Sequence, residues 1–394
     1  MSGRYRILVA DPIAPEGLGP LRDDARFELV PRSALPGREL ALAGFDAVIV
    51  RSETRITREA LAGADRLKVI GRAGVGVDNI DVEAATERGV AVLNAPSGNT
   101  ISAAELTFAL LLALVRRVPA ADRSMKQGEW DRKRFRGIEL HGKTLGLVGA
   151  GRIGGEVARR ARAFGMRVVA YDPYLTEERA RSLEIELAPL DEVLRRADVL
   201  SLHVPLTEST AGMIGARELA LLRPGAFLVN AARGGVVDER ALVRALEERR
   251  LAGAALDVYE EEPLPADHPL RRLENVVLTP HLGAATEEAQ QNVALEIAQA
   301  VRAALLEGDL SRAVNAPAIG GEAMRRLRPL LELAERLGRL AAALADGAIE
   351  GVEVRYAGAA EDALQPLAAA AVAGTLAGVV GRQAVNLVNA LHLA

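Results

Sequence analysis

The sequence contains no cysteine among its 394 residues. Disulfides, thiolate metal sites and cysteine nucleophiles are therefore excluded, and the composition fits a reducing compartment. The sequence also lacks a large excess of charge of either sign, since its formal net charge is −4. Because a basic surface usually drives binding to nucleic acid or to an anionic membrane, we expect neither as a partner.

Long apolar runs are absent as well. The most apolar stretch, Leu106–Val115, is far shorter than the ~20 residues that span a bilayer. It predicts a buried helix, and Ser102 and Glu105 have the spacing of a capping box at its start. The N-terminal "MSGRYRILVADP" shows no secretory signal pattern. We therefore expect a cytoplasmic protein.

What the sequence does contain is a regular alternation of short apolar runs with helical patterns. This predicts an α/β fold with two doubly wound parallel-sheet domains and a partial α+β unit at the C-terminal end. We expect residues 1–97 and 286–313 to form one discontinuous domain, residues 98–285 a second domain inserted in it, and residues 314–394 the third unit. The strand candidates are "RILVA", "AVIV", "LKVIG", "VAVLN", "LGLVGA", "RVVAYD", "VLSLHV", "AFLVNAA", "GAALDVY" and "NVVLTP", and "GVEVRYAG" is strand-like.

A glycine turn lies between a strand candidate and a helix at Gly149-Ala-Gly-Arg-Ile-Gly154. Glycines at this spacing allow a tight turn, close approach of a pyrophosphate and close helix–strand packing, while the helix N-terminus attracts the pyrophosphate charge. The next strand ends at Asp172, whose carboxylate suits a ribose diol and repels a 2′-phosphate. The segment therefore predicts an NAD site.

A second glycine loop begins at Gly71 in "GRAGVGVDNID". Its next strand ends in Asn94 and supplies no carboxylate for a ribose, so the loop is a poor dinucleotide site. Its backbone amides and Arg72 suit a small anionic substrate, and a purely structural turn is the alternative.

Three polar residues with complementary chemistry follow three successive strand candidates. His281 follows "NVVLTP", Glu262 follows "LDVY" and Arg233 follows "LVNAA". Oxidation of an alcohol needs a base for the hydroxyl proton and a cation to orient the substrate. We expect these residues to supply them. His203 is expected to line the cofactor cleft or to pack at a strand end, and His141, His268 and His392 to be surface or loop residues. We expect no metal site.

Six blocks of the sequence resemble the D-isomer-specific 2-hydroxyacid dehydrogenases, and most closely the branch that oxidises 3-phospho-D-glycerate. These blocks are "GRAGVGVDNID", "GNTISAAELT", "GKTLGLVGAGRIG", "VNAARGGVVDE", "ALDVYEEEP" and "TPHLGAAT". The resemblance implies a Rossmann NAD domain inserted in a flavodoxin-like substrate domain. It also implies that Arg233 binds the substrate carboxylate, that His281 is the general acid/base and that Glu262 pairs with the histidine.

The resemblance further implies the other contacts of the site. For NAD it implies contacts from Gly149, Gly151, Arg152, Ile153, Gly154, Asp172, Val204, Ala231, Asp257, Gly283 and Ala284. For 3-phosphoglycerate it implies contacts from Arg51, Arg72 and Gly74, with Arg132 reaching the site of a neighbouring subunit. A solvated basic loop is the alternative for Arg132. The expected assembly is a homodimer or a homotetramer.

The resemblance also places the chain in metabolism and suggests alternatives. It implies NAD-dependent oxidation of 3-phospho-D-glycerate to 3-phosphohydroxypyruvate, the first step toward serine. The alternatives are a glyoxylate or hydroxypyruvate reductase and a non-enzymatic NAD-sensing corepressor or scaffold. Residues 314–394 resemble part of an extra domain that longer bacterial members carry before a serine-binding ACT domain. Since no complete ACT domain fits before Ala394, we expect a catalytic core that is insensitive to serine.

Overall fold

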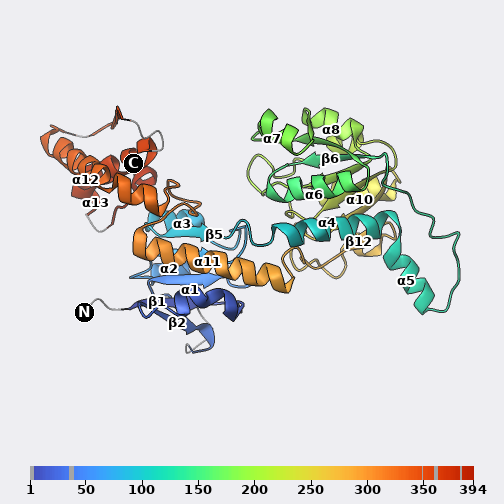
Figure 1. The fold of residues 1–394 in the computed structure, drawn as a ribbon, viewed down its shortest axis with the longest axis horizontal. Helices are drawn as coiled ribbons and strands as arrows, with labels where there is room; N and C mark the ends of the chain where they lie inside the picture. Colours follow the sequence, from blue (N-terminus) through green and yellow to red (C-terminus); the bar gives the residue numbers. More distant parts are fainter. Residues whose placement is uncertain (1–3, 35–39, 348, 359–362, 382–383) are drawn as a thin grey trace. The chain divides into compact units, whose positions relative to one another are not determined.

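The computed structural model describes residues 4–34, 40–347, 349–358, 363–381 and 384–394. Contacts within the chain define two compact units, which are traced in Figure 1. Unit 1 comprises residues 1–98 and 290–394, and unit 2 comprises residues 99–289. Within the described residues, none of the helices combines the length and the apolar character needed to cross a membrane.

Unit 1 contains a five-stranded parallel sheet with the strand order β2-β1-β3-β4-β5. This is the flavodoxin-like order, in which the chain starts near the middle of the sheet and winds outward in both directions. The strands are β1 (Tyr5–Val9), β2 (Phe27–Pro31), β3 (Ala47–Val50), β4 (Val69–Arg72) and β5 (Ala91–Asn94).

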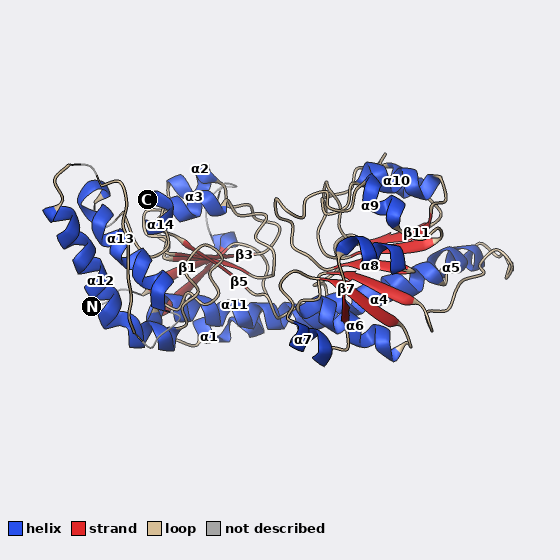
Figure 2. Ribbon diagram, turned by 90° about the horizontal axis from the view of Figure 1, so that it is seen from above, coloured by secondary structure: helices blue, strands red, loops and turns tan. Residues whose placement is uncertain are grey.

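Both faces of this sheet are covered because its strands are apolar on both faces. Ile7 and Ile49 belong to the core on one side, and Leu8 and Val48 belong to the core on the other. Successive side chains of a strand point to opposite faces, so a continuous apolar run needs helices on both sides. The helices are α1 (Gly19–Arg22) and α11 (Glu287–Glu307) on the first side, and α2 (Arg58–Ala62) and α3 (Val82–Glu87) on the second, as Figure 2 shows. Two short 3-10 helices, η1 (Pro15–Leu18) and η2 (Arg32–Ala34), lie in the connections.

The C-terminal part of unit 1 contains helices α12 (Gly321–Leu344), α13 (Leu364–Val380) and α14 (Ala390–Leu393), and it packs onto the rest of this unit. Leu327 and Leu367 share one apolar core with Val301 of α11. The part expected as α+β is helical wherever the structure describes regular elements in it, and the strand-like segment 351–358 pairs with no strand among these residues.

Unit 2 contains a seven-stranded parallel sheet with the order β12-β11-β10-β9-β6-β7-β8. Counted from β6, this is the dinucleotide-binding order with one further strand at the edge. Its direction of winding reverses between β6 and β9. The strands are β6 (Thr144–Val148), β7 (Arg167–Tyr171), β8 (Glu186–Leu187), β9 (Val199–Leu202), β10 (Ala226–Asn230), β11 (Leu251–Leu256) and β12 (Val276–Leu278).

Helices cover both faces of this second sheet (Figure 2). Phe108 of α4 and Val157 of α6 pack with Leu145 on one face, whereas Leu194 of α8 packs with Leu200 on the other. The helices of unit 2 are α4 (Thr100–Val115), α5 (Val118–Lys126), α6 (Arg152–Ala163), α7 (Glu177–Ser182), α8 (Leu190–Arg196), α9 (Ala216–Leu221), α10 (Glu239–Glu247) and the 3-10 helix η3 (Pro269–Arg272).

Two strands were not predicted, and one local expectation is wrong. Strands β2 and β8 were not among the sequence candidates, because one ends in proline and the other has only two residues. The expected capping box at α4 is wrong. The Ser102 hydroxyl bonds to the hydroxyl of Thr286 at 2.7 Å, and Glu105 pairs with Arg160 at 3.3 Å.

Candidate active site

The cofactor and catalytic residues expected in unit 2, apart from Arg132, lie along one edge of the seven-stranded sheet. Each follows the carboxyl end of a parallel strand. These ends form the edge at which open α/β sheets bind their ligands. In strand order they are Gly149 to Gly154 after β6, Asp172 after β7, Val204 after β9, Ala231 and Arg233 after β10, Asp257 and Glu262 after β11, and His281, Gly283 and Ala284 after β12.

The glycine turn after β6 has the shape that a dinucleotide requires. A Cβ on Gly149 (φ +90°) would lie 2.5 Å from the carbonyl oxygen of His203, and one on Gly154 would lie 2.3 Å from the carbonyl oxygen of Gly149. A Cβ on Gly151 would meet nothing within 4 Å. Two glycines therefore permit the turn to pack, and the third leaves open space at the start of α6, where helix N–H groups attract phosphate.

Asp172 is held in place at the end of β7. Its Oδ2 accepts a hydrogen bond from the N–H of Ala150 at 2.8 Å, and its Oδ1 accepts one from the N–H of Tyr174 at 2.9 Å. Each carboxylate oxygen can accept a further bond, as a ribose diol would require. The turn and the carboxylate thus fit the adenosine half of NAD.

His203 supports the glycine turn from behind. Its Nε2 lies 2.9 Å from the hydroxyl of Ser201, its backbone packs against Gly149, and its Cβ packs against Gly154. Burial lowers the pKa of His203 to about 4, so the ring is neutral at neutral pH. Of the two roles expected for this histidine, the structure shows packing at the strand end.

His281 and Glu262 form a hydrogen-bonded pair. The Nδ1 of His281 lies 2.7 Å from Oε2 of Glu262, and both side chains are partly exposed. The other carboxylate oxygen, Oε1, accepts a hydrogen bond from the N–H of Tyr259 at 3.1 Å. With Nδ1 engaged by the carboxylate, Nε2 is the ring nitrogen that is left to exchange a proton with a substrate.

The carboxyl group of Glu262 is ionised at neutral pH. Burial alone would raise its pKa, but the hydrogen bond and charge of His281, the Tyr259 N–H and the charge of Arg233 together outweigh burial and lower its pKa below the ordinary value. An ionised Glu262 fixes the orientation of the imidazole ring through the contact with Nδ1.

Asp257 shapes the turn that carries His281. Its Oδ1 accepts bonds from the Thr279 hydroxyl at 2.6 Å and the Leu282 N–H at 2.7 Å, and its Oδ2 accepts one from the Gly283 N–H at 2.9 Å. The turn places His281 in the left-handed backbone region (φ 55°). Burial raises the pKa of Asp257, and these bonds oppose the rise. The family resemblance implies an NAD contact for this aspartate and did not indicate its hydrogen bonds to the turn.

Arg233 lies on the loop after β10, and hydrogen bonds made by the side chain of the last strand residue, Asn230, hold this loop in place. The side-chain amide of Asn230 donates to the Arg233 carbonyl at 2.9 Å and accepts from the Ala232 N–H at 3.1 Å. The next residue, Gly234, lies against the loop after β11, since a Cβ there would be 1.7 Å from the carbonyl oxygen of Tyr259. The loops carrying Arg233 and Glu262 are therefore in direct backbone contact.

Unit 1 brings its own cations to the carboxyl edge of the five-stranded sheet. Arg51 follows β3, and Asp11 accepts a hydrogen bond from its N–H. Arg72 ends β4, and its guanidinium lies so close to Gly74 (φ +155°) that a Cβ there would be 1.5 Å from Nη1. A glycine at position 74 therefore leaves room for the Arg72 guanidinium, which a residue with a Cβ would not.

Arg132 lies elsewhere in unit 2. It is exposed on the loop after α5. On this loop Arg134 approaches Glu274 at 3.7 Å, immediately before β12. His281 follows the other end of β12, so the part of this loop at Arg134 lies toward the edge opposite His281.

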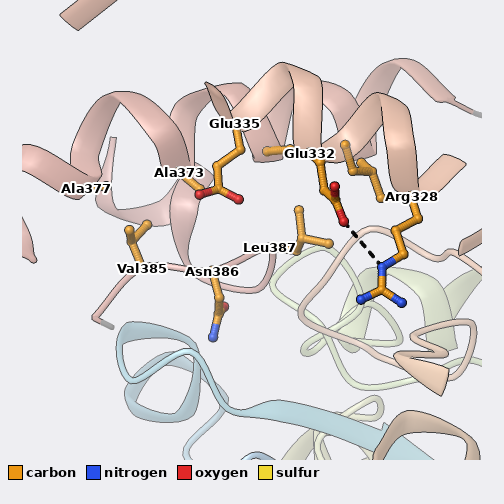
Figure 3. A pocket seen from close by; sticks show the side chains of 10 residues that line it. Arg328, Glu332, Glu335, Ala373, Ala377, Val385, Asn386 and Leu387 are labelled. Atoms are coloured by element: carbon orange, nitrogen blue, oxygen red, sulfur yellow. Dashed lines mark ion pairs between the residues drawn. The ribbon is translucent and has the colours of Figure 1, made fainter. Parts of the chain in front are cut away.

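Two further features of unit 1 have the outline of binding sites. Glu83, Glu87 and His392 place ligand atoms within 4.8 Å of one another, but Glu87 is already paired with Arg58. A pocket of about 390 Å³ lies between α12, α13 and the segment Val385–Leu387 (Figure 3), with an ion pair between Arg328 and Glu332 at 3.4 Å. None of the expected site residues lines this pocket.

Comparison with known proteins identifies relatives over nearly the whole chain. Residues 108–283 match the family described as D-isomer specific 2-hydroxyacid dehydrogenase, NAD binding domain, and residues 326–394 match the D-3-phosphoglycerate dehydrogenase intervening domain. A D-3-phosphoglycerate dehydrogenase of Methanocaldococcus jannaschii is 47% identical over 390 residues, which are 98% of this chain and 74% of the relative.

Solved structures agree with this match. A Thermus thermophilus protein is 40% identical with a TM-score of 0.70, covering 79% of this chain and 100% of its own. The D-lactate dehydrogenase of Aquifex aeolicus, solved with NAD and lactic acid, is 32% identical with a TM-score of 0.68, again covering 79% of this chain and 100% of its own.

Proposed function

The chain belongs to the D-isomer specific 2-hydroxyacid dehydrogenase family, whose members are NAD-dependent oxidoreductases, and we propose that it oxidises 3-phospho-D-glycerate to 3-phosphohydroxypyruvate. The hydrogen-bonded pair of His281 and Glu262 beside Arg233 carries this proposal, because it supplies the base and the cation that oxidation of a 2-hydroxy acid needs. The relatives named D-3-phosphoglycerate dehydrogenase support the choice of 3-phospho-D-glycerate as the substrate.

When bound, NAD would supply the acceptor for the hydride at C2 of the substrate. Arg233 binds the substrate carboxylate through its guanidinium, which suits a planar anion. His281 takes the hydroxyl proton at Nε2, so that the alcohol becomes a ketone. The ionised Glu262 stabilises the resulting imidazolium through the Nδ1–H bond, and in the reverse direction the same ring returns the proton.

Cofactor binding is assigned to the carboxyl edge of the seven-stranded sheet. Gly151, with Arg152 and Ile153 at the start of α6, binds the pyrophosphate, and Asp172 binds the adenosine ribose. The remaining contacts are assigned to Gly149, Gly154, Val204, Ala231, Asp257, Gly283 and Ala284.

The phosphate of the substrate is assigned to unit 1. Arg51, Arg72 and Gly74 lie at the carboxyl ends of two neighbouring strands, and guanidinium groups bind phosphate through paired hydrogen bonds. Arg132 completes the site of a neighbouring subunit in a homodimer, since within one chain the part of its loop at Arg134 lies toward the opposite edge of the sheet from His281. We assign the protein to the cytoplasm, as the sequence predicts.

A steady-state substrate panel tests this function. The chain is assayed with NAD⁺ against 3-phosphoglycerate, glycerate, lactate and 2-hydroxyglutarate. We expect the highest kcat/KM for 3-phosphoglycerate, and Arg72→Ala is expected to remove this preference by raising KM for the phosphorylated substrate alone. Equal or better turnover of the unphosphorylated acids would contradict the assignment.

A further inference from the structure

Glu239 is a buried acid next to the catalytic loops that the proposed mechanism does not use. It is the first residue of α10, and it follows the loop that carries Arg233. Its side chain is only 8% exposed. A carboxylate removed from water in this way is retained only where several donors satisfy it.

One oxygen of Glu239 binds the loop that carries Glu262. Oε1 accepts a hydrogen bond from the N–H of Glu260 at 2.7 Å. In return, Oε1 of Glu260 accepts one from the N–H of Glu239 at 2.9 Å. This reciprocal pair connects the start of α10 to Glu260. The preceding residue, Tyr259, donates its own N–H to Glu262.

The other oxygen binds the segment that leads to β12. Oε2 of Glu239 lies 3.2 Å from Nε2 of His268, while Nδ1 of His268 accepts the N–H of Leu270 at 3.4 Å. With Nδ1 as an acceptor, the proton of the ring lies on Nε2, which donates a hydrogen bond to Glu239. Sequence reasoning took His268 for a surface or loop residue, whereas the structure uses it as a partner for a buried acid.

We propose that Glu239 and His268 form a positioning pair that joins the loops carrying Arg233 and Glu262 to the segment preceding β12 and His281. The inference rests on the proposed function of those three residues. The pair does not touch the substrate. It fixes the distance between the groups that do, and such outer contacts govern the orientation of reacting side chains.

Glutamine cannot replace Glu239 in this arrangement. The site presents two donors, the Glu260 N–H and the His268 Nε2–H, and a glutamine offers one acceptor oxygen and one donor amide. Protonation of Glu239 creates the same conflict. Besides His268, the charged groups that influence Glu239 are Glu260 and Glu262, and burial together with these two charges raises its pKa. Protonation of Glu239 therefore adds a component to the acid-side fall of the wild-type activity that Glu239→Gln lacks, whereas the fall caused by protonation of the catalytic base is common to both proteins.

The test compares Glu239→Gln, His268→Ala and His268→Gln with Glu247→Gln, an exposed acid on the same helix. All variants are assayed at a temperature where they are folded. Glu239→Gln and His268→Ala are each expected to lower kcat about tenfold and to leave KM for NAD within about twofold. The double variant is expected to lose less kcat than the two single losses combined would predict. His268→Gln, which keeps a donor near the Nε2 position, is expected to recover much of kcat. Glu247→Gln is expected to match the wild type.

A second readout separates this inference from the proposed function. With only five histidines in the chain, the ring signals of His281 can be assigned in NMR spectra recorded without substrate. We expect Glu239→Gln and His268→Ala to shift the NMR signal of His281 Nδ1, the ring nitrogen that contacts Glu262. A failed substrate panel with a shifted signal would overturn the function but leave the link between these residues. An unshifted signal with unchanged kcat in His268→Ala would overturn the positioning role, even if Glu239→Gln does not fold.

Discussion

Replacement of His281 must remove the imidazole without adding backbone strain. The residue has a φ of 55°, in the left-handed region that asparagine tolerates better than most other residues. We therefore expect His281→Asn to fold normally, to bind NAD with nearly unchanged affinity and to lose ~10²–10⁴ in kcat. Steady-state rates together with NAD titration measure this. His141→Asn, at an exposed histidine of the same unit, is the control, and near-normal turnover of His281→Asn would mean that another group moves the proton.

Asp172 combines two duties that a substitution can separate. Its carboxylate holds the N–H groups of Ala150 and Tyr174, and its charge repels a 2′-phosphate. Asp172→Asn keeps one acceptor oxygen and removes the charge. We expect the ratio of kcat/KM for NAD to that for NADP to fall at least about tenfold, or about 1.4 kcal/mol. An unchanged ratio would exclude this role.

His203 predicts how stability depends on pH. Its pKa is about 4 in the folded chain, against 6.5 for a histidine in water. Between these two pH values the residue binds a proton in the unfolded chain but not in the folded chain. Stability from this residue is therefore full above pH 6.5 and is lost as the pH falls toward 4. The whole difference corresponds to about 3 kcal/mol, and the partial exposure of His203 reduces it to about 1–2 kcal/mol. Denaturant unfolding at pH 7 and pH 5 measures the loss, which His203→Gln is expected to diminish.

At the same scale, the sequence predicts those site residues whose chemistry can be read one at a time. His281, Glu262 and Arg233 each follow an apolar run, and parallel strands bring their carboxyl ends to one edge. Asp257 and Glu239 carry no such signal for the roles seen here, because those roles depend on which backbone N–H groups face them. Such partners are set by loop conformations, which periodicity does not encode.

Among the elements, the loops after β10 and β11 depend on one glycine. A Cβ on Gly234 would lie 1.7 Å from the carbonyl oxygen of Tyr259, which is a backbone atom that no rotamer change can move. We expect Gly234→Ala to push the Arg233 loop away from Glu262 and to lower kcat about 10²-fold, the order of loss that a 1 Å misplacement causes. Gly212→Ala (φ +62°) adds backbone strain without a neighbour within 4 Å and serves as the control. Equal losses in the two variants would show that the close approach of Gly234 to Tyr259 is not the cause of the effect.

Elements were predictable where the apolar pattern was long and uninterrupted. The buried helix predicted from the apolar stretch Leu106–Val115 is observed as part of α4 (Thr100–Val115). Strands β2 and β8 were missed because β2 ends in proline, β8 has only two residues, and both depend on pairing with a neighbouring strand. The capping box at α4 failed for a related reason, since Ser102 found a tertiary partner in Thr286.

For the whole molecule, unit 2 exposes apolar side chains around α5 that suit an interface between subunits. Met125 is 52% exposed and Trp130 is 76% exposed. We expect the wild type to run as a dimer, and the double variant Met125→Glu with Trp130→Glu to shift toward the monomer because two charges would be buried at the contact. Light scattering at several protein concentrations measures the mass. Leu337→Glu, on an exposed face of α12, is the control for a general effect of added charge.

The position of Arg132 leads to a test of whether two subunits build one site. If Arg132 acts on the neighbouring subunit, a heterodimer of Arg132→Ala and His281→Asn chains contains one complete site, with His281 from the first chain and Arg132 from the second. If Arg132 acts within its own chain, both sites of that heterodimer are defective. We expect co-expressed and doubly tagged heterodimers to recover about half of the wild-type kcat per dimer, while each variant alone stays low. No recovery in purified heterodimers would place the action of Arg132 within its own chain or outside the site.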